Sequence, residues 1–129
     1  MDINWLAVGA AALSSFLLGG VWYSALFAKP WQTAAGLSDA QIKAGNMPLI
    51  FGGSFVLSLI ASASFAVFLG PDVDAATGAM YGFTAGLCWV TASFGINYLF
   101  ERKNLTLLLI NGGYHTLQFT LIGLILGAM

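Results

Sequence analysis

The sequence predicts an all-α integral membrane protein, a single domain of four transmembrane helices joined by short loops. Hydrophobic residues make up 59% of the 129 residues and charged residues only 7%, against roughly 25% charged residues in an ordinary soluble domain. Four uncharged segments are also each long enough to cross a hydrocarbon core, which takes about 20 residues of helix. A chain with so few polar groups cannot cover a water-exposed surface, so we expect the lipid bilayer to be its solvent.

The predicted spans run over four segments: Ile3 to Ala28, Leu49 to Leu69, Ala76 to Phe100 and Leu105 to Met129. Because the bilayer core offers no water to backbone N–H and C=O groups, each segment must satisfy them internally as a helix. The first span has no basic residue before it and is longer than the apolar run of a signal peptide. We therefore expect it to be retained in the mature protein.

The charged residues of the loops predict the orientation. All Lys and Arg residues fall between spans one and two or between spans three and four: Lys29, Lys43, Arg102 and Lys103. The termini and the loop between spans two and three carry acidic residues instead: Asp2, Asp72 and Asp74. Because loops rich in Lys and Arg stay in the cytoplasm, we expect a multi-pass protein with both termini in the periplasm.

The first cytoplasmic connection contains the signature of a short helix. Ser38 and Gln41 are spaced as a capping box, in which each side chain satisfies the backbone N–H of the other residue. Gly45 follows as a residue suited to end a helix. We expect a helix from about Asp39 to Ala44, lying at the cytoplasmic surface of the membrane.

Small residues indicate where helices pack. Gly78, Gly82 and Gly86 recur every four residues in the third span and so form a smooth groove on one helical face. Such a groove lets a second backbone approach closely. The partner helix could belong to the same bundle or to a second copy, and we expect a homo-oligomer, with a dimer favoured.

Two pairs of short segments suggest an internal repeat. Leu26 to Lys29 resembles Leu99 to Arg102, and Leu49 to Gly53 resembles Leu109 to Gly113. Each repeat unit would be a two-helix hairpin, and the two hairpins would be related by an axis along the membrane normal. Chance similarity between Leu- and Gly-rich helices is the alternative explanation.

The fourth span carries the most distinctive polar group. His115, the only histidine, lies about 15 Å into the span at 1.5 Å per residue, and Asn111 and Gln118 share its helical face. An ionisable residue at this depth is a functional candidate, because leaving it unpaired in lipid is costly. The simpler alternative is a polar clamp between helices, since two amides can supply the donor and acceptor that a neutral imidazole needs.

A second polar group is expected nearer the cytoplasm. Asn97 lies in the third span, where its amide needs hydrogen-bonding partners inside the bundle. Tyr23 of the first span and Asn111 lie at a compatible depth. Aromatic residues at this level also act as interfacial anchors, so Tyr23 has a structural explanation as well.

Several classes of function lack the residues that they require. Four basic residues are too few for a nucleic-acid surface. One histidine, one cysteine and spans without carboxylates leave no metal or haem site, so we expect no metal and no cofactor. The sequence motifs of nucleophilic, phosphate-binding and dithiol enzymes are missing. An enzyme is the function that the sequence favours least.

Five short motifs occur in order along the chain: Trp22-Tyr23-Ser24 with Phe27, Lys29 and Trp31; Gly36-Leu37-Ser38; Asn46-Met47; Asn97-Tyr98-Leu99-Phe100-Glu101; and Asn111-Gly112-Gly113-Tyr114. Together they resemble the motifs of a bacterial membrane family catalogued as domain of unknown function 1761, over essentially the whole chain. The chain departs from the family at Ala25, where proline is expected, and at His115, where histidine is not. The resemblance implies a small four-helix protein of the bacterial inner membrane. It supplies no activity, substrate or catalytic residue.

Two functions follow as expectations. The first is a structural or accessory subunit of the inner membrane, with lipid and a second copy of the chain as partners. The second is the binding or transport of a small molecule through a midplane cavity lined by His115, Asn111 and Asn97. Its ligand would be unidentified. A cavity lined by these three residues would distinguish the second function from the first.

Overall fold

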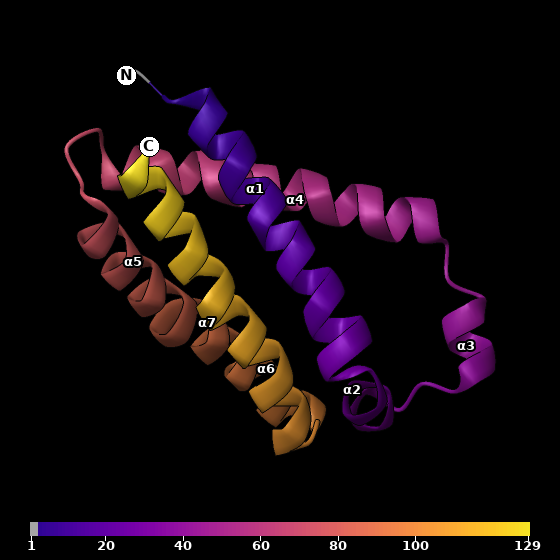
Figure 1. Cartoon of the computed structure of the whole chain (residues 1–129). Helices are drawn as coiled ribbons and strands as arrows, with labels where there is room; N and C mark the ends of the chain where they lie inside the picture. The colour runs from indigo at the N-terminus through magenta and orange to yellow at the C-terminus, as the bar shows by residue number, and fades with distance from the viewer. Residues whose placement is uncertain (1–2) are drawn as a thin grey trace.

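The computed structural model describes residues 3–129, and every regular element in that range is helical (Figure 1). Met1 and the acidic Asp2 of the predicted outer face lie outside the described residues. The elements in chain order are α1 (Trp5–Gly20), η1 (Val21–Leu26), α2 (Ala28–Ala35), α3 (Asp39–Lys43), α4 (Met47–Leu69), α5 (Ala75–Thr84), η2 (Ala85–Thr91), α6 (Ala92–Glu101) and α7 (Leu105–Ala128). The wider π-helical turns η1 and η2 continue the helices that precede them, so the chain forms four long helices.

Each long helix begins at a side chain that caps it. The oxygen of each capping side chain accepts a hydrogen bond from a backbone N–H in the first turn: Asn4, Asn46, Asp74 and Asn104. The first N–H groups of a helix have no partner within it, and Asn or Asp before the helix satisfies one of them. These four residues therefore set where the helices start.

Three of the long helices are long and apolar enough to cross a membrane: Trp5–Leu26, Met47–Leu69 and Ala75–Glu101. The fourth, α7, has 24 residues and no charged side chain but is not among these three. Asn111, His115 and Gln118 are the physical reason, since each places a polar side chain in the helix. Of the four predicted spans, the structure thus supports three by length and composition.

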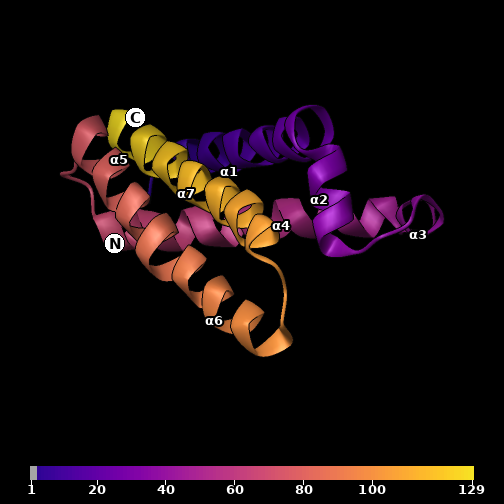
Figure 2. The ribbon, with the colours of Figure 1, turned by 90° about the horizontal axis from the view of Figure 1, so that it is seen from below.

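Helix α7 is the centre of the bundle. It packs along α5 and η2 on one side and along α1 on the other, and it also contacts α2, α4 and α6 (Figures 1 and 2). Helix α4 packs mainly against α1 and crosses the bundle obliquely, so that its N-terminal half extends away from α7. The buried core lies where these helices meet, around Ala11, Phe65, Ala85 and Ile122.

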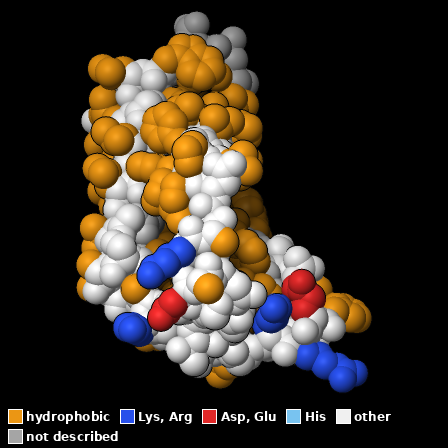
Figure 3. Space-filling model, turned by 90° about the vertical axis from the view of Figure 1, so that its right-hand side faces the viewer, with side chains coloured by type: hydrophobic (Ala, Val, Ile, Leu, Met, Phe, Trp, Pro, Cys, Tyr) orange, Lys and Arg blue, Asp and Glu red, His pale blue; other side chains and the backbone are white. Residues whose placement is uncertain are grey.

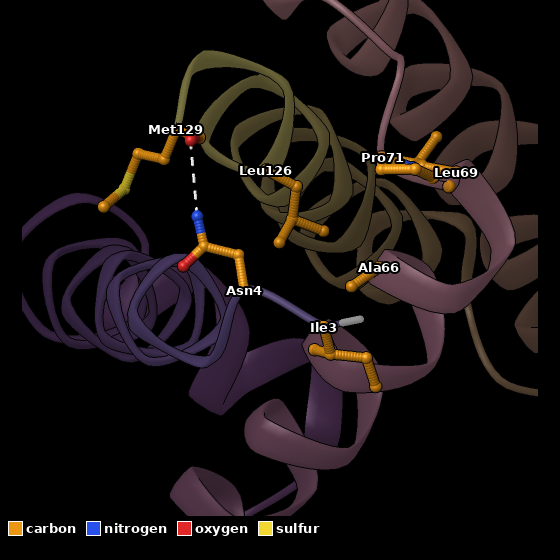
Figure 4. Close-up of a pocket in the computed structure, with 8 residues that line it drawn as sticks. Ile3, Asn4, Ala66, Leu69, Pro71, Leu126 and Met129 are labelled. Carbon is orange, nitrogen blue, oxygen red and sulfur yellow. Dashed lines mark hydrogen bonds between the residues drawn. The ribbon is translucent and has the colours of Figure 1, made fainter. Parts of the chain in front are cut away.

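The two ends of the bundle differ in character. At one end, Asn4 donates a hydrogen bond to the Met129 carbonyl oxygen at 3.3 Å, beside the loop at Gly70 and Pro71 (Figure 4). The described chain termini and the α4–α5 loop therefore share this end. At the other end, Asn104 donates to the Ala34 carbonyl oxygen at 3.0 Å and joins the α6–α7 turn to α2. The Lys, Arg, Asp and Glu side chains visible in Figure 3 gather at this second end.

The connection between α1 and α4 corrects one expectation and confirms another. It contains two helices rather than one, because the chain leaves the first span at Phe27 and forms α2 before α3. Gly36, with φ of 74°, ends α2 in the left-handed conformation that glycine adopts at little cost. Helix α3 has the predicted capping box, with Ser38 Oγ accepting from the Gln41 N–H at 3.2 Å and Gln41 Oε1 from the Ser38 N–H at 2.8 Å. The helix ends at Lys43 and its C-cap is Ala44, so Gly45 is not the cap.

Candidate functional site

The glycines of the third span face α7. A Cβ atom built on Gly82 would lie 1.9 Å from the Phe119 carbonyl oxygen, and one built on Gly86 would lie 2.6 Å from the His115 carbonyl oxygen. Both distances are far shorter than any real contact, and backbone atoms of a helix cannot move aside as a side chain can. The partner of this glycine face is thus a helix of the same chain, and not a second copy.

Two glycines of α7 complete the contact and were missed in the sequence. Gly123 lies against Gly78, and a Cβ on Gly127 would lie 2.2 Å from the Asp74 carbonyl oxygen. Their spacing of four residues matches the spacing in the third span, and this was the signal that could have identified them. We call the contact between Gly78, Gly82 and Gly86 on one side and Gly123 and Gly127 on the other the glycine seam.

His115 lies between two helices and is partly buried. Its Nδ1 is 2.7 Å from Gln118 Oε1, and its ring stacks on Phe94 with the ring centres 5.0 Å apart and the planes 17° apart. Because an amide oxygen only accepts hydrogen bonds, Nδ1 carries the proton in this arrangement. The imidazole therefore joins α7 to α6 by stacking and continues through Gln118 to the other side of the bundle.

Gln118 connects this histidine to α1 and α4. Its Nε2 donates to Ser15 Oγ at 2.5 Å, and Ser15 Oγ lies 3.4 Å from Ser58 Oγ. Ser58 in turn donates to the Ser54 carbonyl oxygen of its own helix at 2.9 Å. Ser15 is fully buried and Gln118 is 6% exposed, so these bonds form in an environment where an unpaired polar group is costly. We call His115, Gln118, Ser15 and Ser58 the polar chain.

Asn111 forms a second group nearer the charged end. Tyr23 Oη donates to Asn111 Oδ1 at 2.6 Å, and Asn111 Nδ2 donates to Tyr98 Oη at 2.7 Å. The indole N–H of Trp22 donates to the Ile110 carbonyl oxygen at 2.9 Å. Tyr23 and Asn111, which were predicted to lie together near the cytoplasm, are thus in direct contact. The other partner of Asn111 is Tyr98, where Asn97 was expected.

The structure does not bring Asn97 to either group. Its side chain is exposed on the outer face of α6, where it lines a shallow depression of about 370 Å³ together with Trp89 and Phe94. Neither His115 nor Asn111 lines this depression or the three other surface depressions described for residues 3–129. Asn97, Asn111 and His115 therefore do not surround a common cavity among these.

The chemistry available to these groups is limited. His115 is the one ionisable imidazole, its hydrogen-bonding partner is a neutral amide, and the rest of the polar chain consists of hydroxyl groups. Within residues 3–129, no three His, Cys, Asp or Glu side chains lie close enough to hold a metal ion. Such an arrangement can hold three helices in register and orient a histidine. It has no adjacent carboxylate that would activate one.

Comparison with known proteins agrees with the motifs and adds no activity. The family model described as "Protein of unknown function (DUF1761)" matches residues 6–127. No curated protein and no solved structure gives a match. The matched region runs from the first turns of α1 to the end of α7 and includes both polar groups and the glycine seam. The chain belongs to the family of proteins of unknown function termed DUF1761.

Proposed function

We propose that this protein is a structural or accessory subunit of the bacterial inner membrane, built on four membrane-crossing helices. The observation that carries the proposal is the polar chain, in which the central polar side chains of α7, α1 and α4 bond to one another. A binding site would keep such groups free for a ligand. Here they hold helices together, as polar residues do between membrane helices.

The position of α7 supports a fourth span despite its polar residues. Its large exposed apolar side chains are all leucines: Leu105, Leu109, Leu117 and Leu124. The polar side chains of Asn111, His115 and Gln118 bond to or stack on neighbouring helices instead. A central helix can carry polar groups in a bilayer when they face protein and its outer face is apolar. With four spans, the distribution of basic residues favours periplasmic termini.

A homodimer is proposed through the outer face of α6. Because the glycine seam is used within the chain, it does not support association of two copies. Asn97 does support it, because an amide on the outside of a membrane helix needs a partner. An amide carries both donors and an acceptor, so two Asn97 side chains can pair across a two-fold axis. A duplication of the two hairpins is a separate proposal that rests on the matching sequence segments alone.

The structural role is tested by replacing Gln118 with Leu. This change leaves His115 without its acceptor and Ser15 without its donor, so we expect the free energy of unfolding in detergent to fall by about 2 kcal/mol. Ser64→Ala is the control, since Ser64 is exposed and bonds only to its own helix at Ala61. If Gln118→Leu were as stable as the wild type yet reproduced the phenotype of a gene deletion, the polar chain would serve a ligand instead.

The dimer is tested by cysteine cross-linking in membranes. The protein carries one cysteine, Cys88, which is exposed and is first replaced by Ser. In that background Asn97→Cys is expected to give disulfide-linked dimers on oxidation. Leu99→Cys, also exposed but on a nearly opposite face of α6, is expected to stay monomeric. Equal cross-linking of the two variants, or none, would argue against this interface.

A further inference from the structure

We propose that the charged end of the bundle binds one anionic phospholipid, with the headgroup phosphate between Lys29 and Lys103 and an acyl chain between α6 and α7. The inference rests on the proposed membrane location, which puts this end of the helices at a bilayer surface. It assigns a ligand class to two neighbouring depressions that share the residue Asn104.

The first depression offers the chemistry of a phosphate site. It has a volume of about 410 Å³ and is lined by Lys29, Pro30, Thr33, Ala34, Asn104 and Thr106. Lys29 supplies an ammonium group, the two threonines supply hydroxyl donors, and no acidic side chain is among the lining residues. Basic pockets between membrane helices on the positively charged side of a protein are suited to anionic headgroups.

The walls of this depression are held in place. Asn104 Oδ1 accepts from the Leu107 N–H at 2.8 Å and so caps α7, while Asn104 Nδ2 donates to the Ala34 carbonyl oxygen of α2 at 3.0 Å. The bond between α7 and α2 fixes the separation of Thr106 from Lys29. In addition, the first turn of α7 contains no acidic residue, so the positive end of the helix dipole faces the headgroup without neutralisation.

The second depression has the character of an acyl-chain groove. It has a volume of about 380 Å³, and its walls include Gly95, Ile96 and Leu99 of α6 and Leu105 and Leu108 of α7. Helices α6 and α7 diverge toward the turn that joins them (Figure 2). Gly95 contributes to the space, since even a Cβ there would reach only the Leu108 methyl groups, at 3.6 and 3.8 Å.

The charge at the mouth of the groove selects the headgroup. Lys103 lines the groove beside Asn104, and Arg102 precedes it in the turn. Together with Lys29 these residues outnumber the one acid of the turn, Glu101, and charged side chains concentrate at this end (Figure 3). A zwitterionic headgroup carries its own ammonium group, which these cations would repel. We therefore infer a preference for phosphatidylglycerol over phosphatidylcholine.

The test is native mass spectrometry of the full-length protein with either lipid added in equal amounts. We expect the wild type to retain phosphatidylglycerol about tenfold more than phosphatidylcholine. Lys29→Gln combined with Lys103→Gln should abolish this preference, whereas Lys43→Gln, on α3 and outside both depressions, should keep it. Gly95→Leu should fill the groove and lower the retention of both lipids. Millimolar inorganic phosphate should not displace the lipid, and displacement would identify a free-phosphate site instead.

Flotation of each protein with vesicles separates this proposal from the membrane assignment. Wild type and variants are all expected to incorporate and to have the same helical circular dichroism. A wild type that fails to incorporate would overturn the proposed function as a whole. Normal incorporation with equal retention of the two lipids, or a phosphatidylglycerol preference that survives the double substitution, would overturn the lipid site alone.

Discussion

Gly78 of α5 and Gly123 of α7 meet backbone to backbone. A Cβ on Gly78 would lie 2.1 Å from the Gly123 carbonyl oxygen, and a Cβ on Gly123 would lie 1.9 Å from the Gly78 carbonyl oxygen. Each of the two glycines therefore leaves no room for a side chain on the other. The backbone of α7 leaves no room for a side chain at Gly82 or Gly86 either. Close approach of this kind supplies the van der Waals contact that drives helix association where lipid removes the hydrophobic driving force.

Substitution of Gly82 should separate α5 from α7. Even Gly82→Ala inserts a methyl group against the Phe119 backbone, and overpacking of this kind costs about 1–3 kcal/mol. Gly82→Leu should cost more. Gly53→Ala is the matched control, since nothing lies within 4 Å of a Cβ at Gly53 and alanine favours a helix. Thermal unfolding in detergent measures both, and an unchanged midpoint for Gly82→Leu would contradict the packing.

Substitution of His115 should distinguish a clamp from a ligand site. His115→Gln keeps a side-chain donor for Gln118 Oε1 and should change the stability little. His115→Leu removes the donor and should lower the free energy of unfolding by about 1–2 kcal/mol. Chemical denaturation of both variants provides the measurement. If both variants keep the wild-type stability and lose cellular function, the histidine acts on a ligand or a proton.

Cysteine labelling should place the two ends of the bundle on opposite sides of the membrane. In a Cys88→Ser background, Asp72→Cys should react with an impermeant maleimide in intact cells. Ala40→Cys, on α3, should react only after permeabilisation. Ala40 is chosen because it is exposed and its replacement leaves the number of basic residues unchanged. The reverse pattern of labelling would invert the proposed orientation.

The cap of α5 should make stability depend on pH. The Thr77 backbone N–H donates to Asp74 Oδ1 at 2.8 Å, and this bond to the charged form holds the pKa of the Asp74 carboxyl below its ordinary value. A carboxyl with a lowered folded-state pKa stabilises the fold above its unfolded pKa, near 4, and loses that contribution as the pH falls through the folded value.

We therefore expect the thermal midpoint of the wild type to fall on acidification relative to that of Asp74→Asn. Asparagine also caps helices but does not titrate. The two proteins should have similar midpoints at neutral pH and separate below about pH 4. Parallel midpoints over the whole range would show that other groups govern the acid response.

The sequence predicted those features that depend on residues only a few positions apart in the chain. The capping box of Ser38 and Gln41 needs only a spacing of three residues, and it forms as predicted. The family is confirmed as well, because its motifs are contiguous stretches of chain. The contact between His115 and Gln118 likewise follows from their separation of three residues on one helix.

Rotation of a helix about its axis was harder to predict. A span that is apolar all round has little hydrophobic periodicity to show which face turns inward. The depth of Asn97 could be estimated, but its outward direction could not, and Tyr98, the next residue, takes the inward position. Helix α2 was missed because its existence depends on the break at Phe27, a change of backbone direction within an apolar and aromatic stretch.

The central position of α7 has a consequence for the order in which the protein assembles. Helix α5 packs against α7 and its own continuation η2, and it makes little contact with α1 or α4. During synthesis, α1 and α4 can therefore pair as soon as both have entered the membrane, while α5 lacks its main packing surface until α7 emerges. Until that last step, the third helix touches the α1–α4 hairpin only at η2, where Trp89 meets Phe68 and Ala85 lies in the shared core. Ribosome-bound chains cut short before α7 should accordingly be the preferred substrates of membrane quality control.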